Sequence, residues 1–297
     1  MIELVIDQRR RSIGALEVGR VLPFVRRRMV GPFVFFDHMG PVDLPRGIPR
    51  SVDVLPHPHI GLSTVTWLFA GELTHRDSVG SEQGIVPGEL NWMVAGRGIT
   101  HSERLERLRA KGGSLHGIQA WVALPEADEE TEPDFRHHPA EELPLLSDAG
   151  LQIRVLAGEA FGARSAARIH SPLFYLHCEL APGATAAVPA DVSERAAYVA
   201  NGTVEVEGST FQTGQMLVFS KGSTPTLRAR TAATVMMLGG EPLGPRFIDW
   251  NFVSSSRERV EQAVADWRAG RMKLPDFDQE EFVPYPGQTA PRPSGTP

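Results

Sequence analysis

Two pairs of polar residues in the first half of the chain have the types and spacing of metal ligands. The stretch PHPHIGLSTVTW, residues 56–67, places His57 and His59 one residue apart at the start of an apolar, strand-like run. In GRGITHSERL, residues 96–105, His101 and Glu103 have the same spacing. Alternate residues of a β-strand share a face, so each pair projects from one side of its strand. Three imidazoles and one carboxylate favour a first-row divalent metal: iron, nickel, copper, manganese or zinc.

Four protein ligands leave two open positions on an octahedral ion, where a bidentate substrate or dioxygen can bind. A structural zinc site is closed and ordinarily uses cysteines, whereas this chain has one cysteine, Cys178. A single His-x-His pattern is weak, because a histidine beside an apolar strand is more often a core or surface residue. The prediction of a metal site therefore depends on both pairs occurring together.

Several other side chains are weaker candidates for substrate contacts. Trp67, Phe69 and Trp92 are plausible apolar walls for a flat aromatic ligand, although aromatic residues on strands more often belong to the core. His75 can be a histidine close to the metal. More simply, it can be a surface residue or a residue that supports the metal ligands. His38 can lie near the mouth of a barrel, but a hydrogen bond within a loop explains its presence equally well.

The elements that must position these residues are short strands. The chain has 29 glycines and 24 prolines, which separate short apolar runs and favour sandwiches or barrels. Asn201 and Gly202 tolerate the positive φ of a type I′ turn, so they predict a hairpin. A helix is indicated only in SSSRERVEQAVADWRAG, residues 254–270, with a capping box from Ser255 to Glu258 and an end at Gly270.

The two halves of the chain resemble each other. WLFAG, residues 67–71, aligns with YVANG, residues 198–202, and residues 87–103 align with residues 213–229. In the second half the four ligand positions are occupied by Val188, Ala190, Leu227 and Ala229. A barrel of this kind does not need a metal to fold, which indicates that the polar set of the first copy serves another purpose.

Composition excludes some function classes. A net charge of −6 and a pI near 5.9 give no basic face for nucleic acid. The start of the chain is too short and charged for a signal peptide, and no run approaches the roughly 18 apolar residues of a membrane helix. Together with the single cysteine, these features predict a cytoplasmic protein with no nucleic-acid or membrane partner.

The stretches PHPHIGLSTVTWLFAGELTHRDSVG and PGELNWMVAGRGITHSER, with YVANG and residues 239–270, resemble the pirin family of two-domain cupins. The resemblance implies an all-β fold with two cupin-type antiparallel barrels, a bicupin, and a C-terminal helix. Its ligand pattern maps onto His57, His59, His101 and Glu103, with one metal, usually iron. The expected organisation is a metal-binding barrel (1–135), a linker (136–150), a barrel without ligands (151–245), a helix with its extension (246–283) and a flexible tail (284–297).

The resemblance also implies a function. Some pirins are quercetinase-type dioxygenases, so the leading hypothesis is an Fe(II)-dependent oxidoreductase that cleaves a flavonol or a similar enolic aromatic compound with O2. Glu103 then both binds the metal and accepts the proton of the substrate hydroxyl. An alternative is a metal-bearing redox sensor that regulates a transcription factor or metabolic enzyme through a protein partner without turnover. A third is a detoxifying or housekeeping enzyme for another enolic or catecholic compound.

Overall fold

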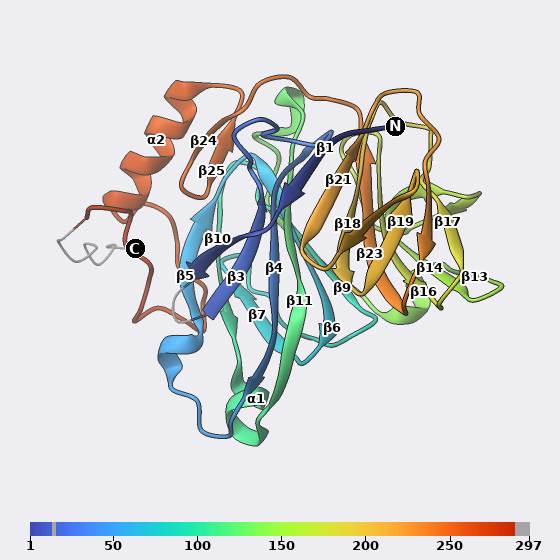
Figure 1. Ribbon diagram of the computed structural model, residues 1–297. Helices are drawn as coiled ribbons and strands as arrows, with labels where there is room; N and C mark the ends of the chain where they lie inside the picture. The colour runs from blue at the N-terminus through green and yellow to red at the C-terminus, as the bar shows by residue number, and fades with distance from the viewer. Residues whose placement is uncertain (14–15, 289–297) are drawn as a thin grey trace. The chain divides into compact units, whose positions relative to one another are not determined.

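The chain forms two compact units (Figure 1). The computed structural model describes residues 1–13 and 16–288. Unit A consists of Ser12–Glu17, Met39–His137 and Gly244–Pro297, and unit B consists of Met1–Arg11, Val18–His38 and His138–Leu243. The units are thus interleaved along the chain, unlike the consecutive ranges 1–135 and 151–245 expected from the sequence. Of the expected tail, 284–297, residues 289–297 lie outside the described part.

Two sheets contain most of the strands of unit A, and the larger one also includes residues 9–11, 18–22, 33–38 and 138, which belong to unit B. The four-stranded sheet has the order β5-β10-β7-β8, with strands Val54–His59, Ile99–Arg104, Leu73–Asp77 and Glu82–Ile85. A seven-stranded sheet has the order β12-β9-β6-β11-β4-β3-β2, with strands Asp134–His138, Leu90–Val94, Leu62–Ala70, Gly113–Ala123, Phe33–Leu44, Leu16–Leu22 and Arg9–Ile13. The pairs with a defined register in these sheets are antiparallel.

Unit B repeats the arrangement. Its four-stranded sheet has the order β17-β22-β19-β20, with strands Thr185–Ala187, Thr226–Ala229, Thr203–Val206 and Ser209–Gln212. The larger sheet has the order β1-β21-β18-β23-β16-β14-β13, and β15 (Ala163–Arg164) pairs with β14. Its strands are Ile2–Asp7, Gln215–Phe219, Glu194–Asn201, Ala233–Gly240, Leu173–Leu180, Leu151–Ala160 and Leu145–Asp148.

The internal repeat seen in the sequence therefore corresponds to two sheets of the same order. In unit A, β9 pairs with β6 and β6 with β11. In unit B, β21 pairs with β18 and β18 with β23 in the same way. The pair Thr66↔Asn91 in unit A matches Ala197↔Leu217 in unit B, as the sequence alignment predicts.

The hairpin predicted at Asn201–Gly202 is wrong. Strand β18 ends at Asn201 and β19 begins at Thr203, but these strands pair with different partners in different sheets. Gly202 has a φ of 83°, and the residues here form a corner between two sheets. The tight turn lies at Glu207 and Gly208, where φ is positive at both residues and β19 pairs with β20.

The C-terminal helix α2 (Arg257–Arg268) packs on unit A beside the two-stranded sheet of β24 (Phe247–Asp249) and β25 (Phe252–Ser254) (Figure 1). Its buried face, which includes Val260 and Trp267, contacts Ile60 and Phe252. The helix begins one residue later than a Ser255 cap requires, because Ser256 Oγ accepts the hydrogen bond from Arg259 N. The short helix α1 (Glu106–Lys111) follows β10. Neither helix in the described residues is long and apolar enough to cross a membrane.

Candidate metal centre

Three of the four expected ligands converge on one point inside unit A. His57 and His59 project from β5, and His101 projects from β10, directly opposite His57 in the register. One ligand atom from each histidine lies within 4.8 Å of the other two. The ring centroids of His57 and His101 are 4.3 Å apart, and those of His59 and His101 are 5.1 Å apart. The strand alternation inferred from the sequence thus brings the three imidazoles together.

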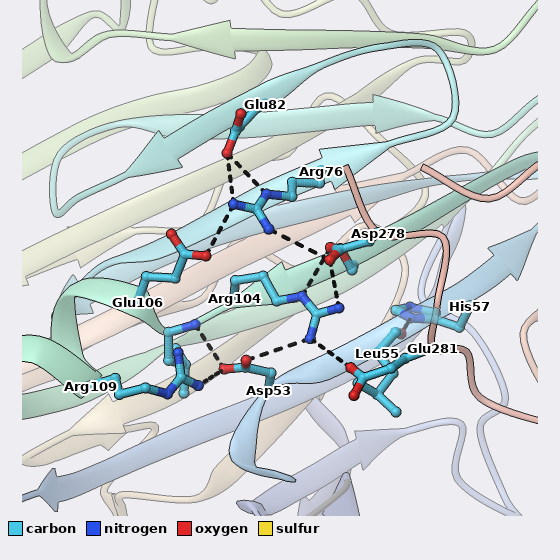
Figure 2. Close-up of polar contacts among 12 residues, drawn as sticks. Asp53, Leu55, His57, Arg76, Glu82, Arg104, Glu106, Arg109, Asp278 and Glu281 are labelled. Atoms are coloured by element: carbon cyan, nitrogen blue, oxygen red, sulfur yellow. Dashed lines mark hydrogen bonds and ion pairs between the residues drawn. The ribbon is translucent and has the colours of Figure 1, made fainter. Parts of the chain in front are cut away.

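The hydrogen bonds of these histidines leave metal-binding nitrogens available. His57 Nδ1 donates to Leu55 O at 2.8 Å, a bond shown in Figure 2, and His59 Nδ1 donates to Asn251 O at 3.2 Å. Such a bond at Nδ1 fixes the tautomer and directs Nε2 toward a metal. Within residues 1–13 and 16–288, His59 Nε2 and both ring nitrogens of His101 are buried and have no hydrogen-bond partner. Buried nitrogens without a partner are unfavourable in the protein alone, so the group fits a single metal ion.

The electrostatics of the site favour the ligand form of each histidine. Burial lowers the pKa of His57 to about 4, and the neighbouring charge of His75 lowers it further, against the opposing hydrogen bond to Leu55. Burial also places the pKa values of His59 and His101 well below the ordinary value, and neighbouring histidines add to the effect. All three imidazoles are therefore neutral at pH 7, as metal coordination requires.

Glu103 does not belong to the group of three. It lies two residues beyond His101 on β10, but a register shift between the two residues places Glu103 opposite Val54 of β5. On the other side of β10, Glu103 is paired with His75. Burial raises the pKa of its carboxyl group to about 7. Its role as the fourth ligand remains a prediction.

The weaker candidates are distributed over both units. His75 lies beside the metal group, which consists of His57, His59 and His101. Its ring centroid is 5.2 Å from that of His101, and its Nε2 is 2.9 Å from Asp77 Oδ2. His38 lies in unit B, where its Nδ1 donates to the Tyr198 hydroxyl at 2.7 Å. It is therefore part of a different unit from the three imidazoles.

Trp67, Phe69 and Trp92 do not face the metal group. Trp121 marks the inner face of the seven-stranded sheet, because its ring contacts that of His59 at 5.0 Å. Trp121 is paired with Thr64 of β6, so side-chain alternation puts Trp67 and Phe69 on the opposite face. Trp92, which is paired with Val65, lies on that opposite face as well.

The expectation that Trp67 and Phe69 line the site requires an unbroken alternation of side chains from His57 onward, but there is a break between β5 and β6. Gly61 has a φ of 66°, and a Cβ atom there would lie 2.0 Å from Val253 O. Only glycine accommodates both the conformation and the close approach. The alternation of inward and outward side chains is shifted by one residue at Gly61, so Thr64 and Thr66 face inward.

Two aromatic residues that the sequence interpretation missed line the site instead. Trp121 makes an edge contact with His59, and Phe135 of β12 stacks on His75 with ring centroids 4.2 Å apart. Trp121 ends the run GIQAW and Phe135 lies in an acidic segment. Only the pairing of distant strands brings either residue to the site.

The C-terminal segment packs against the outer side of the strands that carry the three histidines. The outward-facing residues of β10 bind it in turn: Thr100 Oγ1 donates to Lys273 O, and Ser102 Oγ and Arg104 Nε donate to Asp278. Figure 2 shows the Arg104 guanidinium between Asp278, Asp53 and Glu281. Val283 N donates to Pro56 O beside His57. Both ligand strands are thereby fixed on the side away from the metal group.

Unit B has a packed apolar interior at the corresponding positions. Val188, Leu227 and Ala229 belong to its buried core, while Ala190 is exposed. Cys178 lies in the same core, and burial raises its pKa to about 12, as expected for a packed thiol. In the part of the chain that the structure describes, the only group of at least three potential metal ligands is that of unit A.

The fold and the site together define a two-barrel cupin with a group of three histidines in one barrel. The chain belongs to the pirin family: the pirin family model matches residues 15–122, and the pirin C-terminal cupin domain matches residues 175–273. The expectation of two antiparallel cupin barrels with a C-terminal helix is confirmed.

Individual proteins are similar over nearly the whole chain. A pirin-like protein of Caulobacter vibrioides is 62% identical over 288 residues, which cover 96% of this chain and 100% of that protein. Human pirin is 30% identical over 268 residues, covering 87% of this chain and 86% of its own. The crystal structure of a quercetin 2,3-dioxygenase from Acinetobacter baumannii matches with a TM-score of 0.84 and 30% identity, covering 99% of this chain and 94% of that one.

Proposed function

We propose that the protein is a metal-dependent dioxygenase that cleaves a flavonol or a similar enolic aromatic compound with O2. The observation that carries the proposal is the convergence of three neutral imidazoles, of which His59 and His101 have buried nitrogens without a partner among the described residues. The similarity to a quercetin 2,3-dioxygenase supports the substrate class. Iron(II) is the proposed metal, and nickel, copper, manganese and zinc suit the same ligands.

The residues of the site have distinct roles in this proposal. His57, His59 and His101 hold the ion, with Glu103 as the fourth ligand. A bound ion of this kind supplies Lewis acidity and a path for electrons to dioxygen. Glu103, with its pKa raised to about 7 by burial, accepts the proton of the substrate hydroxyl near neutral pH. A general base of this kind typically contributes about 10²–10⁴-fold to the rate.

The aromatic rings beside the metal group support a flat substrate. Trp121 and Phe135 face inward next to His59 and His75, respectively. Their faces and edges provide apolar contacts for an aromatic ring, while the imidazoles and Glu103 are the polar groups that orient it. A small planar molecule with adjacent oxygen atoms is the ligand that this arrangement fits best.

Oxygen uptake tests the proposal. Metal-free protein is loaded with Fe(II) under anaerobic conditions, and oxygen consumption is then measured over a panel of flavonols and catechols. We expect uptake that depends on a flavonol and that is absent in the His101→Leu variant. Uptake with catechols alone identifies another substrate class, and the absence of uptake with every metal and substrate favours a metal-bearing regulator without turnover.

A further inference from the structure

A row of three polar residues crosses the inner face of the seven-stranded sheet. Thr66 of β6 is paired with Asn91 of β9 on one side and with Gln119 of β11 on the other. Gln119 lies two residues from Trp121, whose ring contacts His59, so side-chain alternation places this row on the same inner face as Trp121. All three residues are buried. The row therefore lies inside the barrel that holds the metal group.

The hydrogen bonds within the row leave one donor group unused. Thr66 Oγ1 donates to Gln119 Oε1 at 2.8 Å, and His137 Nδ1 donates to Asn91 Oδ1 at 2.8 Å. Asn91 is only 3% exposed, and its Nδ2 has no hydrogen-bond partner. A buried donor without a partner is unfavourable in the protein alone. His137 thus orients Asn91, while no described residue accepts a hydrogen bond from its amino group.

The other barrel shows that the fold does not require polar residues here. The positions of Thr66, Asn91 and Gln119 correspond by strand pairing to Ala197, Leu217 and Met237 of unit B. These three residues are part of the buried apolar core of unit B. The same row is polar only in the barrel that contains the three imidazoles, which links it to the ligand of that barrel.

The spacing relative to the metal group sets the size of the ligand. Trp121 and Thr64 form the row that touches His59, and the polar row lies two residues further along the strands. Two residues of a strand span about 7 Å. A molecule of two or three rings that binds at the metal group can therefore place an oxygen atom of its far end beside Asn91.

We propose that Asn91, supported by Thr66, Gln119 and His137, is a second anchor that binds a hydroxyl or carbonyl oxygen at the end of the substrate remote from the metal. Asn91 Nδ2 is the donor and the substrate oxygen is the acceptor. This inference rests on the proposed function and deepens it. It assigns to the site a planar aromatic substrate that carries oxygen atoms at both ends, and it makes Asn91 a specificity-determining residue.

Equilibrium binding without turnover tests the anchor. The protein is loaded with Zn(II), kept free of oxygen and titrated by calorimetry with 3-hydroxyflavone, which has no hydroxyl on its outer rings. Galangin, with two hydroxyls on the fused ring, and kaempferol, with a further hydroxyl on the pendant ring, follow. The variant Asn91→Leu copies Leu217 of unit B and removes the donor. Ser63→Ala, on the opposite face of β6, is the control, and Asn91→Ala is used if the leucine prevents folding.

We expect Asn91→Leu to weaken the binding of galangin or kaempferol about tenfold, the loss that corresponds to about 1.4 kcal/mol for one hydrogen bond. Binding of 3-hydroxyflavone changes less than about twofold, and Ser63→Ala leaves all ligands unaffected. A loss for both hydroxylated flavonols identifies the fused ring as the end that Asn91 binds, and a loss for kaempferol alone identifies the pendant ring. Equal binding by Asn91→Leu and the parent protein, or an equal loss for all three ligands, overturns the anchor and leaves the proposed function intact. Failure of the parent protein to bind any flavonol overturns both.

Discussion

Replacement of Asp278 is the sharpest test of how the C-terminal segment supports β10, the strand that carries His101. Asp278 accepts hydrogen bonds from Ser102 Oγ at 2.5 Å and from Arg104 Nε at 2.9 Å. It also pairs with Arg104 Nη2 at 2.8 Å and with Arg76 Nη1 at 3.5 Å. The side chains of Arg104 and Asp278 are 3% and 8% exposed. The pair is therefore shielded from water, and its loss leaves a buried guanidinium without its principal partner.

The structure sets the size of the effect. Breaking a buried ion pair by removing one partner costs about 3–5 kcal/mol. Arg104 keeps Asp53 at 3.5 Å and the half-exposed Glu281 at 3.6 Å. We therefore expect Asp278→Ala to lower the free energy of unfolding by about 3 kcal/mol, the lower end of that range. For a domain of this size the loss corresponds to a fall in Tm of roughly 6–12 °C.

Asp276 provides a matched control on the same segment. Its carboxylate pairs with Lys273 at 2.7 Å, but the two side chains are 44% and 59% exposed. Such surface pairs contribute about 0–1 kcal/mol, so Asp276→Ala leaves the Tm nearly unchanged. Urea unfolding followed by tryptophan fluorescence compares the variants, and hydrogen exchange of residues 271–283 reports whether the segment is released. Equal stabilities of Asp278→Ala and Asp276→Ala would refute the argument from burial.

Three further predictions concern other features. We expect His101→Leu to abolish metal binding, measured by elemental analysis. The metal-free variant is at least as stable as its parent, because the substitution removes two buried nitrogens without partners. A clear loss of stability contradicts this prediction. Ser256→Ala removes the cap that accepts from Arg259 N and lowers the stability by about 1 kcal/mol, measured by urea unfolding, with the exposed residue Glu261→Ala as control. Burial alone would raise the pKa of Asp278, but the hydrogen bonds from Arg104 and Ser102 and the charges of Arg104 and Arg76 place it below its ordinary value of 3.8. The ionised form of Asp278 therefore stabilises the fold above pH 3.8. We expect the difference in unfolding free energy between the parent and Asp278→Asn to shrink as the pH falls below 3.8. A difference that grows in acid contradicts the assignment.

The sequence was most informative where a pattern is local and repeated. The spacing of His57, His59 and His101 predicted three ligands on shared strand faces, and strand pairing brings them together. The alignment of the two halves predicted equivalent strands, and the sheet orders agree with it. These features depend on the two-residue period of a strand, which the sequence displays directly.

Features that depend on how distant segments meet were not predictable. The register shift beyond His101 and the reversal at Gly61 change which side chains face the site, and neither has a signature in the strand residues themselves. Asn201–Gly202 has the composition of a tight turn, but the following strand joins another sheet, so tertiary pairing overrides the local preference. Asp278 lies far along the chain from Ser102, which it binds.

The interleaving of the two units has a consequence for synthesis. Strand β1 leaves the ribosome about 200 residues before β21, the strand with which it pairs, and this interval lasts roughly 10–40 s at ordinary rates of elongation. During this interval β1 remains an unpaired edge, so the larger sheet of unit B cannot be completed until β21 has been made. Unit A gains its helix and C-terminal segment only with residues 244–288, so each half, expressed alone from a gene cut near residue 138, lacks part of its unit, and we expect it to aggregate rather than fold.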